Sequence, residues 1–145
     1  MSPCSTYEDV GLVLRLYEIR REERMREARR WFMTEFKVKT LDEFDKLCPG
    51  GSIENESYRM VVSYWEMVGS FITSGVLQKE LFYESGRELL LTYERVSALL
   101  PALRERASDV RFLKNLEAVA PDYIAWYEKQ APGAHEAFAK RIGAR

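Results

Sequence analysis

A chain of 145 residues is long enough to form one domain that buries about 68–70% of the surface exposed on unfolding, so its core needs no disulfide or metal. Its 22 lysine and arginine residues against 23 aspartate and glutamate residues leave a net charge of -1, which excludes an overall field that attracts nucleic acid or an anionic membrane. Hydrophobic residues make up 46% of the chain, which excludes extensive disorder.

The cysteines and the first apolar run indicate where the protein resides. Cys4 and Cys48 are too few for a disulfide scaffold, so we expect free thiols in a reduced, cytoplasmic protein. The apolar run 11–14 ends at Arg15, whereas a membrane span needs about 20 residues and the core of a signal peptide about 7–15. We therefore expect neither membrane insertion nor export.

A long helix from about residue 5 to 36 is the first predicted element. Ser5 and Glu8 have the spacing of a capping box, and Gly11 is the only residue after them that interrupts helix formation. Roughly 30 helical residues span about 45 Å, which is more than one side of a small bundle requires. We expect an end of this helix to project from the domain or to pair with another chain.

The next part of the chain contains two helices with clear ends. A capping signature at Thr40 predicts a short helix through Leu47, before Pro49 and two glycines. The following helix is predicted from about residue 53 to 73, with Gly75 as its C-cap. Because apolar residues fill most of its circumference, we expect it to be the central helix of the core. Its narrow polar stripe consists of Arg59, Ser63, Glu66, Ser70 and Thr73.

A fourth helix is predicted over about residues 78–100. Gly86 within it indicates a point of close approach between elements, and Pro101 is expected to bend or restart the helix. A charged turn is expected at about 104–109, before a helix that Pro121 is expected to stop.

The last predicted pieces are short, and they complete the fold class. A helical segment around 124–127 is followed by Pro132 and a small tail helix, and no proline-free window shows the alternation of a strand. We therefore predict an all-α fold: a single domain over residues 1–145, built as a helical bundle of about five to six helices with a long N-terminal helix. Residues 1–4 and 132–145 are expected to be less ordered or peripheral.

The segment 15–30 is rich in charge, with seven arginines and four glutamates. Pairs such as Glu22 and Arg26 have the spacing at which side chains meet on one helix, so our first interpretation is a solvated, salt-bridged face. Two alternatives remain: a face that binds a protein partner, and a nucleic-acid interface. The candidate interaction face consists of Arg20, Arg24, Arg26 and Arg30.

Glu66 is the candidate partner for any of these arginines that points inward, because a buried arginine needs a carboxylate. One alternative places Glu66 in the solvent-facing stripe of its helix. The other is a partly buried structural ion pair of Glu66 with Arg24 or Arg30, which would fix the register of two helices. An enzyme that uses Glu66 and an arginine within an aromatic pocket is a further hypothesis.

No spacing typical of a catalytic or metal site occurs in the sequence. His135 is the only histidine and is expected at the surface, so triads and histidine metal sites lack a second member. The segment 49–52 shares only its glycines with a phosphate loop, because no Gly-Lys-Ser/Thr follows. We predict no catalytic, cofactor-binding or metal-binding residues, and no enzyme. Most aromatic residues are expected in the core, and some tyrosines and tryptophans could line a groove for a partner helix or a small ligand.

Four short motifs carry a resemblance to a known family. They are Ala28-Arg29-Arg30-Trp31, Tyr64-Trp65-Glu66-Met67-Val68, Gly75-Val76-Leu77 and Glu80-Leu81-Phe82-Tyr83. With these motifs, residues 15–127 resemble a bacterial all-helical family of unknown function, some of whose members carry N-terminal membrane spans. The resemblance implies an all-α fold, and it implies no activity and no site.

The function that we expect from the sequence is that of a small non-catalytic helical module for binding or scaffolding. Its partner is another protein or a second copy of the chain, reached through the long first helix, and no cofactor is expected. The alternative is a nucleic-acid-associated protein that uses the Arg-rich first helix, and its binding would weaken steeply with salt.

Overall fold

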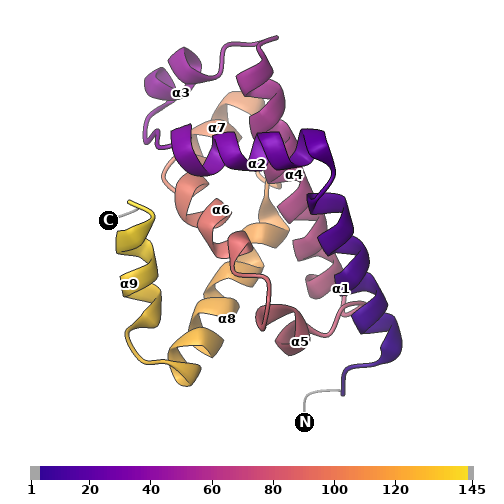
Figure 1. Cartoon of the computed structure of the whole chain (residues 1–145). Helices are drawn as coiled ribbons and strands as arrows, with labels where there is room; N and C mark the ends of the chain where they lie inside the picture. Colours follow the sequence, from indigo (N-terminus) through magenta and orange to yellow (C-terminus); the bar gives the residue numbers. More distant parts are fainter. Residues whose placement is uncertain (1–3, 144–145) are drawn as a thin grey trace.

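The computed structural model describes residues 4–143 and consists of helices joined by short turns (Figure 1). The described residues form nine helices and no strand, which confirms the all-α class but shows that the predicted number of helices is wrong. In chain order the helices are α1 (Tyr7–Arg20), α2 (Glu23–Glu35), α3 (Leu41–Leu47), α4 (Ile53–Thr73), α5 (Lys79–Tyr83), α6 (Glu88–Val96), α7 (Leu100–Ala107), α8 (Lys114–Gln130) and α9 (Ala134–Arg141). Residues 1–3 and 144–145, which are part of the ends predicted to be less ordered or peripheral (1–4 and 132–145), lie outside the described part of the chain.

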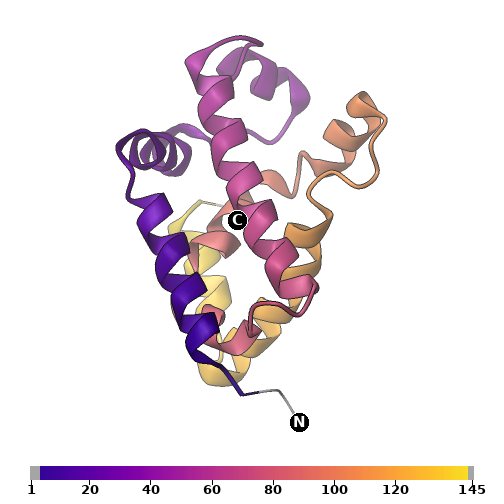
Figure 2. The ribbon, with the colours of Figure 1, turned by 90° about the vertical axis from the view of Figure 1, so that its right-hand side faces the viewer.

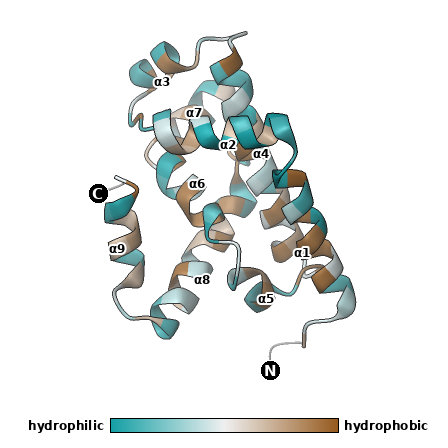
Figure 3. Cartoon of the chain, viewed as in Figure 1, coloured by the Kyte–Doolittle hydropathy of each residue, from teal (hydrophilic) through white to brown (hydrophobic). Residues whose placement is uncertain are grey.

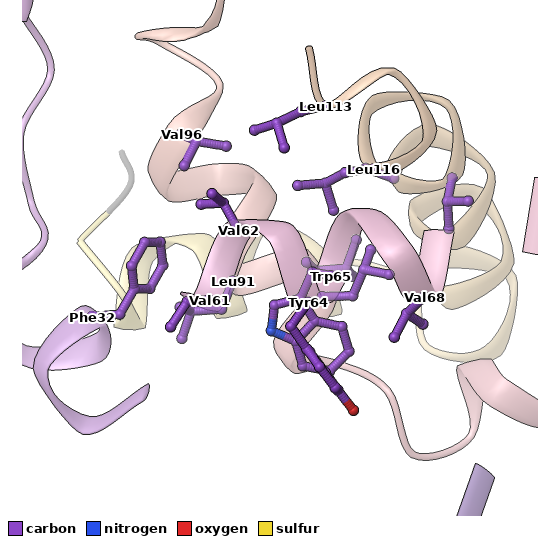
Figure 4. Close-up of a cluster of buried hydrophobic side chains, with 14 of the residues drawn as sticks. Phe32, Val61, Val62, Tyr64, Trp65, Val68, Leu91, Val96, Leu113 and Leu116 are labelled. Carbon is purple, nitrogen blue, oxygen red and sulfur yellow. The ribbon is translucent and has the colours of Figure 1, made fainter. Parts of the chain in front are cut away.

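The core is built around α4, as predicted. This helix packs against α2 on one side and α8 on another, while α6 contacts both α4 and α8. In Figure 4, buried side chains of α4 lie between Phe32 of α2 and Leu116 of α8, and Trp65 is almost fully buried among them. The ends of α4 follow from local sequence, because the Ser52 hydroxyl accepts the Asn55 N–H at its start and a turn through glycine follows its last residue.

The predicted long first helix is wrong, because the chain bends sharply after Arg20 (Figures 1 and 2). The Glu22 carboxylate begins α2 by accepting the backbone N–H groups of Arg24 at 3.0 Å and Met25 at 2.9 Å, and these hydrogen bonds lower the pKa of Glu22. At the end of α1, the Arg29 guanidinium donates to the carbonyl of Arg20 at 3.0 Å. Charged side chains thus replace the backbone hydrogen bonds that a continuous helix would make.

The helix predicted over 78–100 also breaks, into α5 and α6. Gly86 lies in the turn between them, and a Cβ atom added there would be 2.3 Å from Cζ of Phe82. The predicted close approach at Gly86 is confirmed, because the Phe82 ring packs on its backbone where a side chain would not fit.

Pro101 restarts the chain as α7, which agrees with the prediction, because proline fits the first turn of a helix where no N–H partner is needed. The charged turn expected at 104–109 is wrong in its start, since α7 continues to Ala107. The turn itself begins at Ser108, whose φ of 52° is left-handed.

Pro121 does not stop the next helix, contrary to the prediction. It lies inside α8, on the exposed side of the helix. Ala120 and Tyr123, on the opposite side, are buried in the core. Their burial holds the helix together across the hydrogen bond that proline cannot donate.

His135 is buried, which corrects the prediction of a surface residue. Only 7% of it is exposed, and its Nε2 lies 2.8 Å from Oε1 of Glu94 on α6. Because α9 also buries Phe138 and packs against α8, the histidine is an internal polar contact between α9 and α6.

Candidate functional site

The outer side of α1 carries a stripe of large apolar side chains that the rest of the domain leaves uncovered. The exposed fractions are 93% for Tyr7, 43% for Val10, 56% for Leu14 and 47% for Tyr17. Spacings of 3, 4 and 3 residues place these side chains on one side of a helix. We call them the α1 stripe, and Figure 3 shows brown positions along α1 at the edge of the molecule.

The opposite side of α1 is firmly attached to the domain. The buried Asp9 accepts the backbone N–H of Gln78 at 2.9 Å and that of Thr6 at 2.8 Å, and these bonds lower the pKa of Asp9. Further along, the Tyr64 hydroxyl donates to the carbonyl of the buried Leu16 at 2.7 Å. The α1 stripe therefore belongs to an anchored helix that presents it outward.

Charges and a gap flank the α1 stripe. Glu8 and Arg15 are exposed, and because they are seven residues apart they lie along the same flank of the stripe. Gly11 lies beside Leu14, and no atom comes within 4 Å of a Cβ added to it. The α1 stripe therefore offers apolar side chains for contact and has an acidic and a basic group on one flank. At Gly11, near its middle, another backbone has room to approach.

The predicted face of four arginines is not one surface in the structure. The Arg20 side chain is only 14% exposed, with its guanidinium carbon 5.3 Å from the Trp65 ring. Arg24 donates to the Ser57 hydroxyl at 3.1 Å. Arg26 and Arg30 are exposed. Two of the four predicted residues therefore act inside the domain, and two face solvent.

Arg29 and Glu88 form an ion pair that the sequence did not predict. Nε and Nη2 of Arg29 donate to the two carboxylate oxygens, each at 2.7 Å, and Nη1 of Arg20 lies 3.7 Å from Oε2 of the same carboxylate. The hydrogen bonds from Glu88 raise the pKa of Arg29 against the opposing effect of burial. No spacing could have predicted this pair, because 59 residues separate its members.

Local ion pairs of the kind predicted along the first helix are absent from the described residues 15–30. Glu22 is used as the cap of α2 and makes no salt bridge with Arg26.

Glu66 caps a neighbouring helix. Its carboxylate accepts the backbone N–H of Asn115 at 2.8 Å and that of Leu116 at 3.0 Å, at the start of α8. The cap residue of α8 is Leu113, which has no side-chain oxygen and a left-handed φ of 56°, so Glu66 supplies the acceptor that it lacks. Within the described part of the chain Glu66 forms no salt bridge, so the ion pair with Arg24 or Arg30 is not formed.

Gly69 makes this capping contact possible. It lies one turn after Glu66 on α4, and a Cβ atom there would be 3.0 Å from the backbone of Asn115 and Leu116. The two helices therefore approach each other along the polar stripe of α4, where Thr73 also donates to the Asn115 side chain at 2.7 Å. Part of the polar stripe of α4, which was predicted to face solvent, therefore packs against the start of α8.

We expect Glu66→Ala to lower the free energy of unfolding by about 1–2 kcal/mol, because two amide donors at the start of α8 lose their acceptor. Chemical denaturation measures the loss, and amide hydrogen exchange should accelerate at Asn115 and Leu116. Ser63→Ala, on the same stripe, is the control and should stay within about 0.5 kcal/mol. Equal effects of the two substitutions would contradict a capping role for Glu66.

Three features of residues 4–143 bear on possible binding sites: the cysteines, groups of metal-ligating side chains, and helices that could span a membrane. Cys4 and Cys48 are both free, as predicted, and burial raises the pKa of Cys48 to about 11. No group of three or more His, Cys, Asp or Glu side chains in this range could hold a metal ion. None of the helices there is long and apolar enough to cross a membrane.

The chain matches the model of a known protein family. Residues 5–123, from just before α1 to the middle of α8, match the model of a domain of unknown function, DUF4760. The chain belongs to this family. The resemblance found in the sequence is therefore confirmed as to family, and the DUF4760 match includes the whole α1 stripe and the caps of α2 and α8. No curated protein and no solved structure matches the chain.

Proposed function

We propose that the protein is a small non-catalytic helical module that binds a second copy of itself through the α1 stripe. The observation that carries the proposal is the uncovered row of Tyr7, Val10, Leu14 and Tyr17 on a helix whose other side is anchored. Single exposed apolar residues are ordinary, but four in one helical row are typical of an interaction surface.

A second copy fits the α1 stripe because the stripe is self-complementary. In an antiparallel pair of α1 helices centred between its ends, Tyr7 of one copy lies beside Tyr17 of the other, and Val10 lies beside Leu14. The open space at Gly11, close to the centre of the row, allows the two backbones to approach. Each contact then occurs twice, as a two-fold axis requires.

The charges favour the same arrangement. An antiparallel pair places Glu8 of one copy near Arg15 of the other on the flank of the α1 stripe. It also aligns the two helix dipoles in opposite directions, which is favourable. In a parallel pair the two-fold axis would run along the helices and place the two flanks on opposite sides of the contact, so Glu8 and Arg15 would not meet. The 14 residues of α1 span about 21 Å, so the interface is small and we expect a weak, concentration-dependent dimer.

The other functional hypotheses have less support. Nucleic-acid binding would need several free arginines near phosphates, whereas Arg20 and Arg24 have internal partners. An enzyme built on Glu66 would need its carboxylate, which two backbone amides occupy. The free thiols of Cys4 and Cys48 are consistent with the reducing cytoplasm that we propose as the location.

Light scattering after size-exclusion chromatography tests the proposal. We expect the mass to rise toward that of a dimer as concentration increases to about 1 mM, a range that detects dimers with a binding free energy as weak as about −4.1 kcal/mol. Leu14→Glu should abolish the rise, because it places a charge at the centre of the interface. Val110→Glu is the matched control, since Val110 is 83% exposed on a turn far from α1 in sequence, and it should dimerise like the unmodified chain.

A charge exchange distinguishes the antiparallel dimer from other uses of α1. Glu8→Arg and Arg15→Glu should each weaken dimerisation, and the double variant should restore it because the pairs re-form with opposite sign. A monomer at all concentrations would overturn the proposal, as would a dimer that Leu14→Glu leaves intact. Binding of nucleic acid that falls steeply with salt and with charge reversal at Arg26 and Arg30 would favour the alternative function instead.

A further inference from the structure

A pocket of about 450 Å³ lies between α8 and the turn that joins α5 to α6. Its volume is within the range of small-molecule sites. Four aromatic residues and two residues of opposite charge define its chemistry: Tyr83, Tyr123, Trp126, Tyr127, Glu84 and Arg87. None of these residues belongs to the α1 stripe, so the cavity is independent of the proposed dimer contact.

The aromatic walls are held in place before any ligand arrives. The rings of Tyr83 and Tyr123 stack with centroids 4.2 Å apart, and the Trp126 ring meets that of Tyr123 edge-on at 6.0 Å. The Tyr123 hydroxyl donates to the carbonyl of Tyr83 at 2.6 Å, and the Tyr83 hydroxyl donates to Asp122 at 2.7 Å. A wall whose side chains are already fixed loses little conformational entropy on binding.

Arg87 is a cation without a carboxylate partner among the described residues. Its guanidinium carbon lies 5.0 Å from the Tyr127 ring centre and 5.9 Å from that of Phe138, so aromatic faces hold the group while its N–H donors form no hydrogen bond with the described part of the chain. Elsewhere in the domain, Arg104 and Arg106 are each bonded to a carboxylate. Arg87 therefore offers a planar, oriented set of donors of the kind that binds a carboxylate.

Glu84 is the complementary group. It lies three residues before Arg87 and lines the same cavity, and its carboxylate makes no hydrogen bond or salt bridge with any described residue, Arg87 included. Two opposite charges that share one cavity without pairing can each accept a group of opposite sign from a ligand. An anion alone would be repelled by Glu84, and a cation alone by Arg87.

We propose that this cavity binds a small zwitterion with an aromatic body, which is the chemistry of a free aromatic amino acid. Arg87 binds the carboxylate of the ligand and Glu84 binds its ammonium group. The apolar body of the ligand packs against Trp126 and Tyr127, where ring stacking adds to burial. This assigns a ligand site to a region that neither the dimer contact nor the capping network uses.

Three probes that share one phenylethyl body test the assignment by calorimetric titration: phenylalanine, phenethylamine and 3-phenylpropionate. The second lacks the carboxylate and the third lacks the ammonium group. We expect phenylalanine to bind at least about tenfold more tightly than either, since each missing charge removes one charge-assisted contact. The indole N–H resonance of Trp126 should shift during the titration, which places the ligand in this cavity.

Two variants assign the charges separately. Arg87→Gln should remove the preference for phenylalanine over phenethylamine, and Glu84→Gln should remove the preference over 3-phenylpropionate. Arg59→Gln, an exposed arginine on α4, is the control and should change neither. Because Glu84 makes no side-chain bond with the described residues, Glu84→Gln tests the site even if Arg87→Gln disturbs the stacked rings.

The zwitterion site would be established if Arg87→Gln removed only the preference over phenethylamine and Glu84→Gln removed only the preference over 3-phenylpropionate. Absence of binding by all three probes would overturn it, and so would equal affinity for phenylalanine and 3-phenylpropionate, which would show that Glu84 contributes nothing. A dimer defect in Leu14→Glu with unchanged phenylalanine binding would show that the α1 stripe and this cavity act independently.

Discussion

Glu88→Gln is expected to destabilise the protein by about 3–5 kcal/mol, because it removes the carboxylate from a partly buried cluster and leaves two cations behind. Glu88 accepts two hydrogen bonds from Arg29 at 2.7 Å and lies 3.7 Å from Arg20. The side chains of Glu88 and Arg29 are only 14% and 20% exposed, so water replaces the lost partner poorly. Urea denaturation followed by circular dichroism measures the difference in the free energy of unfolding.

The control for this prediction is an ion pair in full contact with water. Asp42 and Lys46 are paired on α3 with side chains 79% and 77% exposed, and Asp42→Asn should cost less than about 0.5 kcal/mol. The double variant Arg29→Met with Glu88→Met should lose less than the sum of the single changes, since it removes both charges together. Similar effects of Glu88→Gln and Asp42→Asn would show that solvent screens the Glu88 cluster.

The Glu88 cluster also explains why α1 and α2 are separate helices. Arg29 binds Glu88 with one edge of its guanidinium and the carbonyl of Arg20 with the other. One side chain therefore ties the end of α1 to the start of α6 and satisfies a carbonyl that the bend leaves open. The bend lets α1 lie along the domain with its outer side uncovered, which is the geometry on which the proposed dimer depends (Figure 2).

Elements with local signals were predictable from the sequence. The helix after Thr40 and the helix from residue 53 to 73 have both ends where capping residues and glycines indicated them. Their ends depend on side chains within three or four residues of the backbone groups that they satisfy, as with Thr40 and Glu43. A single sequence contains that information.

Breaks that depend on distant partners were not predictable. The bend after Arg20 is stabilised from α6, because Arg29 bonds the Glu88 carboxylate. The cap that Glu66 forms was likewise not among the predicted alternatives, because its partners, the first amides of α8, lie about 50 residues further along the chain. Periodicity describes one helix at a time and cannot show such contacts.

The candidate site was predicted in part. The first helix was expected to pair with another chain, but the face was assigned to arginines rather than to the apolar stripe. Leu12, Val13 and Leu16 make the other side of α1 apolar as well, so the sequence alone could not show which row the domain would cover. The spacing of Tyr7, Val10, Leu14 and Tyr17 was the available signal, and it became informative only once the buried side was known.

Arg95→Met is expected to cost about 3 kcal/mol, although the substitution removes a buried charge. Arg95 is only 7% exposed and donates to the carbonyls of Phe36 at 2.8 Å and Ile142 at 2.7 Å. These carbonyls end α2 and α9, where the negative ends of the helix dipoles favour a cation. Burial lowers the pKa of Arg95, and no carboxylate of the described residues offsets this effect, so the carbonyls alone compensate the charge.

Chemical denaturation should show the loss in Arg95→Met, and amide exchange should accelerate in α9, because one guanidinium joins that helix to the end of α2. Arg95→Lys keeps the charge but has no planar fork that reaches both carbonyls, so it should fall between Arg95→Met and the unmodified chain. Arg106→Met, which breaks the exposed pair with Asp45, is the control and should cost less than about 1 kcal/mol. If Arg95→Met were as stable as the unmodified chain, the cost of burying the charge would equal the gain from its hydrogen bonds, and α9 would be held by Phe138 and the contact of His135 with Glu94 alone.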